Sequence, residues 1–165
     1  MIICGIDPGK TGALAFMRSD PAQLMSVTPM PIAREAGRRT SKTKKMVNWW
    51  AVCAAIREAE PDLLVIERQG ARPGQGISST FSIGFQYGAL LGIASCLGIP
   101  YEIVEPSVWK RAMGLTGLDK DASRHRAAEL MPEGAAFFTR QLDHGRAEAC
   151  LIALWKLAYE RPRAA

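Results

Sequence analysis

Apolar residues recur along the chain in short runs that turn-forming residues separate. Runs of this length, bounded by Gly, Pro or Asp, predict β-strands. The first two flank a glycine-containing connection and so predict a hairpin. The run LLVI before Glu67 is apolar throughout, which is typical of a central strand covered on both faces. The runs that predict strands are residues 2–6, 13–17, 24–30, 62–66 and 101–104.

Longer stretches between and after these runs predict helices. The longest, residues 78–97, has Ser78 or Ser79 in position for an N-cap and Gly98 in position to end the helix. The others are residues 47–59, 106–113, 122–130 and 148–159. Three leading strands followed by alternating helices and strands predict an α/β fold, with a mixed sheet of about five strands, the first three antiparallel, and helices on both faces. We expect one domain over residues 1–165.

A glycine repeat marks one face of the longest predicted helix. Gly84, Gly88 and Gly92 are spaced four residues apart, so they lie on one side of that helix. Glycine lets a second backbone approach closely. The sequence leaves open whether the approaching element is another helix of the same chain or a second copy at a dimer seam.

Composition excludes several classes of protein. The 165 residues are 48% hydrophobic and 22% charged, which is typical of a globular domain rather than a collagen, a coiled coil or a disordered chain. Four scattered cysteines without a C-x-x-C pair predict buried thiols rather than zinc ligands. No continuous run reaches the ~18 apolar residues of a membrane helix, and the N-terminus lacks signal-peptide features. We therefore expect a cytoplasmic protein with no membrane partner.

The excess positive charge is confined to one segment. The net charge is +5, and residues 34–45 hold six cations and one acid, or 6 − 1 = +5. Such a block predicts a loop, over residues 32–46, that binds phosphate backbones. The alternative is a solvated loop with no partner. The residues predicted to contact nucleic acid are Arg38, Arg39, Lys42, Lys44 and Lys45.

Two acids directly follow apolar strands. Asp7 follows IICGI and Glu67 follows LLVI. In open α/β sheets, chemistry gathers at such strand ends, and a charge beside a buried run is costly unless it is paired, hydrated or bound to metal. Each acid has a structural alternative: Asp7 precedes Pro-Gly and could initiate a turn, and Glu67 could pair with Arg68.

A third acidic element, DHGRAE, opens the last helix. Asp143 is a candidate metal ligand or, alternatively, an N-cap. His144 and Glu148 are four residues apart and share a helix face. Acids that converge from three places repel one another unless cations join them, and hard oxygen ligands favour Mg²⁺ or Mn²⁺. Two such ions can clamp the attacking and leaving oxygens of a phosphodiester.

Four motifs in this order resemble RuvC-type Holliday junction resolvases, a family of the ribonuclease H-like superfamily. The matching segments are ICGIDPGKTGALAF, LLVIERQ, FSIGFQYGALLGIASCLGIPYEIVEPSVWK and DHGRAEACLIALW. Together they touch most of the chain, and the DHGRAEA form resembles the phage and plastid branches. The resemblance implies a ribonuclease H-like fold and a homodimer that binds a four-way DNA junction. Each subunit would nick one strand by Mg²⁺-dependent hydrolysis, leaving 5′-phosphate and 3′-hydroxyl ends.

The resemblance also implies a set of catalytic ligands. Asp7 and Glu67 would be the strand-end ligands, with Asp143 and Glu148 on the last helix and His144 as a possible substitute. The resemblance further implies two Mg²⁺ ions per active site, for which Mn²⁺ can substitute. Many members carry acid-x-x-acid on this helix, whereas here the residue three before Glu148 is a glycine.

Further residues are assigned by position in the family. Lys120 resembles the lysine placed near the scissile phosphate, as part of the catalytic set, and Lys110 resembles a DNA-contacting lysine. The loop after Glu67 lacks the aromatic that bacterial members wedge into the junction. Polar contacts to DNA are expected there instead, from Gln69, Arg72 and Gln75.

Several alternatives remain from the sequence. The chain could be a ribonuclease H-like nuclease for RNA–DNA hybrids or flaps, or a non-catalytic junction-binding protein. G-I-D-x-G-x-T-G also occurs in sugar-kinase-like ATPases, but the chain is too short for two such lobes, so no nucleotide cofactor is expected. The expected location is the cytoplasm, or the host cytoplasm if the protein is phage-encoded, since no transit peptide supports an organelle stroma.

Overall fold

A five-stranded mixed sheet forms the centre of the computed structural model, which describes residues 1–35 and 44–159. Its strand order is β3-β2-β1-β6-β7. β1, β2 and β3 pair antiparallel, whereas β6 pairs parallel to both β1 and β7. The predicted α/β class, with three leading antiparallel strands, is confirmed. The strands are β1 (Ile2–Asp7), β2 (Ala13–Ser19), β3 (Ala22–Pro29), β6 (Leu63–Glu67) and β7 (Tyr101–Val104).

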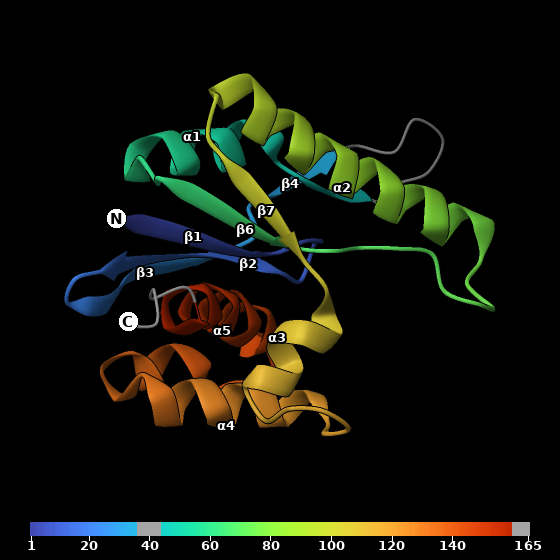
Figure 1. The fold of residues 1–165 in the computed structure, drawn as a ribbon. Helices are drawn as coiled ribbons and strands as arrows, with labels where there is room; N and C mark the ends of the chain where they lie inside the picture. The colour runs from blue at the N-terminus through green and yellow to red at the C-terminus, as the bar shows by residue number, and fades with distance from the viewer. Residues whose placement is uncertain (36–43, 160–165) are drawn as a thin grey trace.

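Helices cover both faces of this sheet, as Figure 1 shows. α1 (Trp49–Ala59) and α2 (Ile77–Leu97) lie on one face, and α5 (His144–Tyr159) lies on the other. α3 (Pro106–Ala112) and two 3₁₀ segments, η1 (Pro132–Phe138) and η2 (Gln141–Asp143), lie on the side of α5, and α4 (Lys120–Leu130) packs against α5 away from the sheet. Because β1 and β6 are covered on both sides, their residues are almost all apolar and buried.

The contact between α5 and β1 is unusually close. A β-carbon at Gly5 would lie 2.3 Å from the carbonyl oxygen of Ala149 and 2.6 Å from the backbone nitrogen of Ala153. Glycine on the strand and alanines on the helix therefore let the two backbones meet. This contact sets how far the helix stands from the end of β1, and so where its first turns lie.

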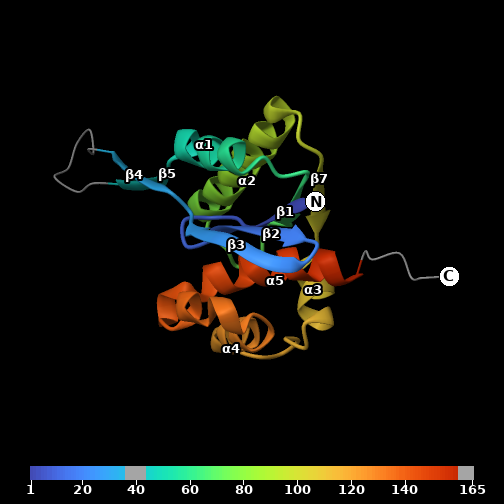
Figure 2. The same cartoon turned by 90° about the vertical axis from the view of Figure 1, so that its left-hand side faces the viewer.

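The prediction of a loop over residues 32–46 is wrong at both ends of that range, where the chain forms β-strands. β4 (Ile32–Glu35) and β5 (Lys44–Val47) pair antiparallel as a two-stranded ribbon, which projects from the body of the molecule in Figure 2. Ile32 pairs with Val47, and buried Val47 anchors the stem in the core below α1. The many basic residues of this segment favoured a loop in the prediction, although apolar residues pair across its two strands. Arg38, Arg39 and Lys42 lie outside the described residues, as does the side chain of Lys44, while Lys45 is exposed on β5.

The longest helix begins one residue earlier than predicted. α2 starts at Ile77 with Gly76 as its N-cap, without a capping side chain, so neither Ser78 nor Ser79 caps it. Gly98 ends the helix with φ 66°, as expected. By length and composition alone α2 is apolar enough to cross a membrane, with a mean hydropathy of 1.3 over its apolar window. Leu90 and Ala94 bury one face of it in the core with α1.

The opposite face of α2 is open. A β-carbon at Gly84, Gly88 or Gly92 would meet nothing within 4 Å, so in the described part of the chain no helix packs against the glycines. Phe81 is 75% exposed and Phe85 is 54% exposed near the same face. The structure therefore removes internal helix packing as the reason for the glycine repeat.

Replacing Gly5 by Ala tests the close contact between α5 and β1. The added methyl group must displace backbone atoms, so we expect a loss of about 1–3 kcal/mol in the free energy of unfolding, as for other overpacked cores. Denaturant titration measures the loss. Gly70→Ala is the matched control, because a β-carbon there meets nothing within 4 Å. Equal stability of the two variants would contradict the contact.

Candidate functional site

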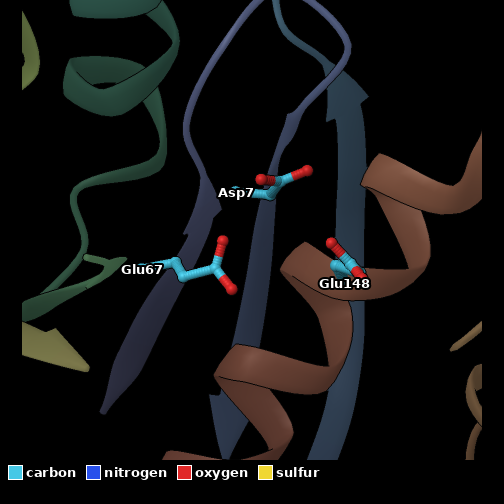
Figure 3. A group of neighbouring side chains, drawn as sticks. All are labelled: Asp7, Glu67 and Glu148. Carbon is cyan, nitrogen blue, oxygen red and sulfur yellow. The ribbon is translucent and has the colours of Figure 1, made fainter. Parts of the chain in front are cut away.

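Three carboxylates from distant parts of the chain converge at one edge of the sheet. Asp7 is the last residue of β1 and Glu67 is the last residue of β6. Because these strands are parallel neighbours, their carboxyl ends meet. Glu148 reaches the same place from α5, and one carboxylate oxygen of each acid lies within 4.8 Å of the others. Figure 3 shows the three side chains facing a common space.

Two further glycines lock the loop after Asp7 against α5. A β-carbon at Gly12 would lie 1.9 Å from the carbonyl oxygen of Asp7. A β-carbon at Gly145 would lie 2.1 Å from the carbonyl oxygen of Thr11. The loop is thus held between the end of β1 and the first turn of α5. Since Gly145 precedes Glu148 by one turn, this packing directs Glu148 toward Asp7.

Burial makes the cluster electrostatically costly when it holds no cation. Glu67 is 6% exposed and Asp7 is 9% exposed. Burial raises the pKa of Glu67 above its ordinary value, and the charge of Glu148 raises it further. The hydrogen bond that Trp109 Nε1 donates to Glu67 Oε1, at 3.1 Å, acts in the opposite direction. Trp109 is fully buried.

One lysine partly neutralises the cluster. Lys110 Nζ lies 3.0 Å from Glu148 Oε1, which also accepts a hydrogen bond from Ser123 Oγ at 3.2 Å. The same ammonium group lies 5.1 Å from the centre of the Trp109 ring. Lys110, predicted to contact DNA, therefore lies at the rim of the acidic site and contacts a carboxylate.

The structure does not bring Asp143 or His144 into the cluster. Asp143 Oδ1 accepts hydrogen bonds from Arg140 and Arg146, and Oδ2 accepts one from the backbone of Arg140. These partners hold the pKa of Asp143 below its ordinary value. His144 Nδ1 lies 3.3 Å from the carbonyl oxygen of Gln141. The expected fourth ligand is therefore not supported, because arginines already occupy the Asp143 carboxylate.

Polar side chains of the loop after Glu67 form hydrogen bonds within the loop and to its neighbours. Gln69 Nε2 donates to Glu67 Oε2 at 3.3 Å, which connects the loop to the cluster. Gln75 Oε1 accepts from the backbone of Arg72 at 3.1 Å, and Gln75 Nε2 lies 3.3 Å from Ser79 Oγ. Gln69, Arg72 and Gln75 thus shape the loop. Any role for them in binding stays a prediction.

Sequence reasoning missed two residues of the site, and the structure does not describe the side chain of a third residue that was predicted. Trp109 orients Glu67, and Ser123 donates to Glu148. The position of Trp109 directly before Lys110, after a predicted strand, was the available signal, whereas nothing in the sequence marks Ser123. The backbone of Lys120 opens α4, but its side chain lies outside the described residues.

The donor set fits a hard divalent cation. Three carboxylates offer oxygen ligands, and the described residues place no thiol or imidazole among them. Oxygen-only sets favour Mg²⁺, Mn²⁺ or Ca²⁺ over softer metals. A bound cation would also remove the repulsion between Glu67 and Glu148.

Glu67→Gln should stabilise the protein in chelator at neutral pH. A folded-state pKa above the ordinary value means that stability falls as pH rises from that value through the folded pKa. Glutamine removes this loss and still accepts from Trp109. We expect a rise of roughly 2–4 °C in Tm for each kcal/mol recovered, and no rise below pH 4, where Glu67 is protonated in both states. Thermal melts at the two pH values measure it; a lower Tm for Glu67→Gln at neutral pH would contradict the electrostatic account.

Comparisons with known proteins agree on the fold. No family model matches the chain. The chain is similar to the chloroplastic Holliday junction resolvase MOC1 of Chlamydomonas reinhardtii, with 33% identity over 109 residues, or 64% of this chain. It spans 12% of the length of that relative. The expected cytoplasmic location is contradicted, because this curated relative is described as chloroplastic.

Solved structures cover nearly the whole chain. T. thermophilus RuvC in complex with a Holliday junction substrate matches with a TM-score of 0.68 and 19% identity, over 98% of this chain and 96% of that one. The Fowlpox virus resolvase, solved with Holliday junction DNA, matches with a TM-score of 0.54 and 14% identity, over 96% of this chain and 97% of that one. The chain therefore has the RuvC-type, ribonuclease H-like fold.

Proposed function

We propose that this chain is the catalytic domain of a structure-selective endonuclease that resolves four-way DNA junctions. The observation that carries the proposal is the convergence of Asp7, Glu67 and Glu148 on one space. The similarity to a curated Holliday junction resolvase, and the shared fold with junction-bound RuvC, support the choice of substrate. A nuclease acting on hybrids or flaps would use the same acids, so only substrate preference separates these functions.

Asp7, Glu67 and Glu148 would hold Mg²⁺, or Mn²⁺ as a substitute, beside the scissile phosphate. Two divalent ions held there would provide the means to activate a water molecule and to neutralise the developing charge. Trp109 holds the Glu67 carboxylate in one orientation through its indole N–H. Lys110, beside Glu148 and partly exposed, lies where its charge can also meet the phosphate.

Hydrolysis then replaces one bond to phosphorus by another. The oxygen of water bonds to phosphorus, the bond from phosphorus to the 3′ oxygen breaks, and that oxygen takes up a proton. The products are a 5′-phosphate and a 3′-hydroxyl end. Lys120, at the start of α4, remains the proposed lysine near the scissile phosphate.

DNA binding extends onto the β4–β5 ribbon. Arg34 pairs with Lys45 across this ribbon, so cations from both strands lie together on the stem. The chain between them holds further cations, among them Arg38, Arg39 and Lys42. This segment supplies the phosphate contacts away from the acids, each of which releases counterions. Gln69, Arg72 and Gln75 contact the crossover from the loop after Glu67.

Two copies associate through α2, so that two acidic sites act on one junction. The open glycine face of α2 supports this arrangement, because Gly84, Gly88 and Gly92 would let a second backbone approach closely. Phe81 and Phe85, exposed near the same face, would be buried by the second copy.

Asp7→Asn and Glu67→Gln should abolish junction cleavage but spare junction binding. A metal ion supplies several kcal/mol of transition-state stabilisation, so we expect the rate to fall by more than about 100-fold. Gel assays with a four-way junction, duplex, flap and RNA–DNA hybrid, each in Mg²⁺ and in chelator, measure it. Glu58→Gln, an exposed acid on α1, is the control. Equal cutting of all four substrates contradicts junction selectivity, and normal cutting by both site variants contradicts the site.

Phe81→Glu should convert a dimer into a monomer. A buried charge at the seam costs several kcal/mol without a partner, which is enough to dissociate an interface of ordinary strength. Sedimentation equilibrium should give twice 18.0 kDa for the wild type and 18.0 kDa for the variant. Phe137→Glu, exposed on η1, is the control. A monomeric wild type would remove α2 as a seam.

A further inference from the structure

A second, positively charged pocket lies beside the acidic site. It has a volume of about 250 Å³ and lies between the loop after Asp7, the end of β3 and the entrance to α5. Lys10 contributes from the loop, and Arg140, His144 and Arg146 contribute from η2 and α5. We refer to these residues, with Asp143, as the arginine pocket. The sequence analysis does not predict a function for Lys10, Arg140 or Arg146.

Asp143 holds the two arginines in place. Its side chain is 3% exposed, and its Oδ1 accepts from Arg140 Nη2 at 2.9 Å and from Arg146 Nη1 at 2.8 Å. Because one carboxylate serves two guanidinium groups, one positive charge is left over, and Lys10 adds a second. The formal charges of Lys10, Arg140, Arg146 and Asp143 therefore sum to about +2 in the arginine pocket.

The arginines keep hydrogen-bonding capacity for a ligand. Each guanidinium has five N–H donors. Within the described residues, the only partner of Arg146 is Asp143, and Arg140 donates to Asp143 alone. Fixed guanidinium groups with donors to spare are suited to the paired oxygens of a phosphate.

The loop that separates the two sites belongs to both. Its Thr11 packs against Gly145, and Gly12 packs against the carbonyl of Asp7. Lys10, Thr11 and Gly12 line the arginine pocket on the other side. The two sites are therefore joined by one short stretch of chain, since Asp7 begins this loop and Lys10, Thr11 and Gly12 line the arginine pocket.

We propose that the arginine pocket binds a second backbone phosphate of the cleaved strand, a few nucleotides from the scissile one. Arg146 and Arg140 donate to its non-bridging oxygens, Lys10 adds charge, and Asp143 positions the arginines. The phosphate fixes the register of the strand over the acids. This inference rests on the proposed function, because its ligand is junction DNA. The binding measurement that tests it does not depend on cleavage.

Methylphosphonate substitution tests the subsite one phosphate at a time. Junctions carry a single neutral linkage at each position near the cleavage point, and binding is measured in Ca²⁺ and cleavage in Mg²⁺. In the wild type, one linkage should weaken binding by about ten- to hundredfold, the range for charged hydrogen bonds. Arg146→Gln should weaken binding of the unmodified junction similarly, and lose its sensitivity to that one linkage. Arg146→Lys should fall between them.

Controls separate the subsite from general effects. Arg57→Gln, at an exposed position on α1, should leave the sensitivity unchanged, and thermal melts check that each variant folds. Asp143→Asn should weaken the sensitivity, which a merely structural role would not change. Two results would overturn the subsite: Arg146→Gln stays sensitive to the same methylphosphonate linkage, or no linkage weakens binding by the wild type. If the wild type still cleaves junctions, the proposed function stands in either case. If Arg146→Gln removes the effect of one linkage on binding but the wild type cleaves no junction, the subsite stands and the proposed nuclease function is overturned.

Discussion

The backbone of α5 lies against β1 at a distance that only glycine allows. Gly5 meets the backbone of Ala149 and Ala153 directly. On one side of that contact, Glu148 reaches the end of β1, and on the other the apolar turns of α5 fill the core beneath the sheet. A wider gap would leave Asp7 and Glu67 together but without a third acid. The site is therefore a consequence of backbone packing as much as of its acids.

The surroundings of two buried carboxylates near this contact shift their pKa values in opposite directions. Asp143 is surrounded by arginines, and its pKa lies below the ordinary value. Glu67 has another acid as its neighbour, and its pKa lies above the ordinary value. Arginines of the protein itself pair with Asp143, whereas we propose that a cation pairs with Glu67. Electrostatics thus distinguishes the acid that the protein neutralises from the acid proposed as a metal ligand.

The sequence contained most of the fold and three of the four predicted carboxylate positions. Apolar runs marked the five strands of the sheet, and strand-end placement marked Asp7 and Glu67. Local patterns could not show that Arg140 and Arg146 occupy Asp143, because the outcome depends on side-chain geometry. Nor could they show Ser123 beside Glu148, or an apolar stem within the basic segment, since both depend on tertiary pairing.

Anomalous diffraction from crystals soaked in Mn²⁺ tests the central claim most directly. The account predicts a peak in the space between the three acids, with carboxylate oxygens of Asp7, Glu67 and Glu148 at about 2.0–2.3 Å, as expected for small divalent ions with oxygen ligands. The peak should disappear in a Glu148→Gln crystal. Manganese bound elsewhere, with this space empty in the wild type, would contradict the account.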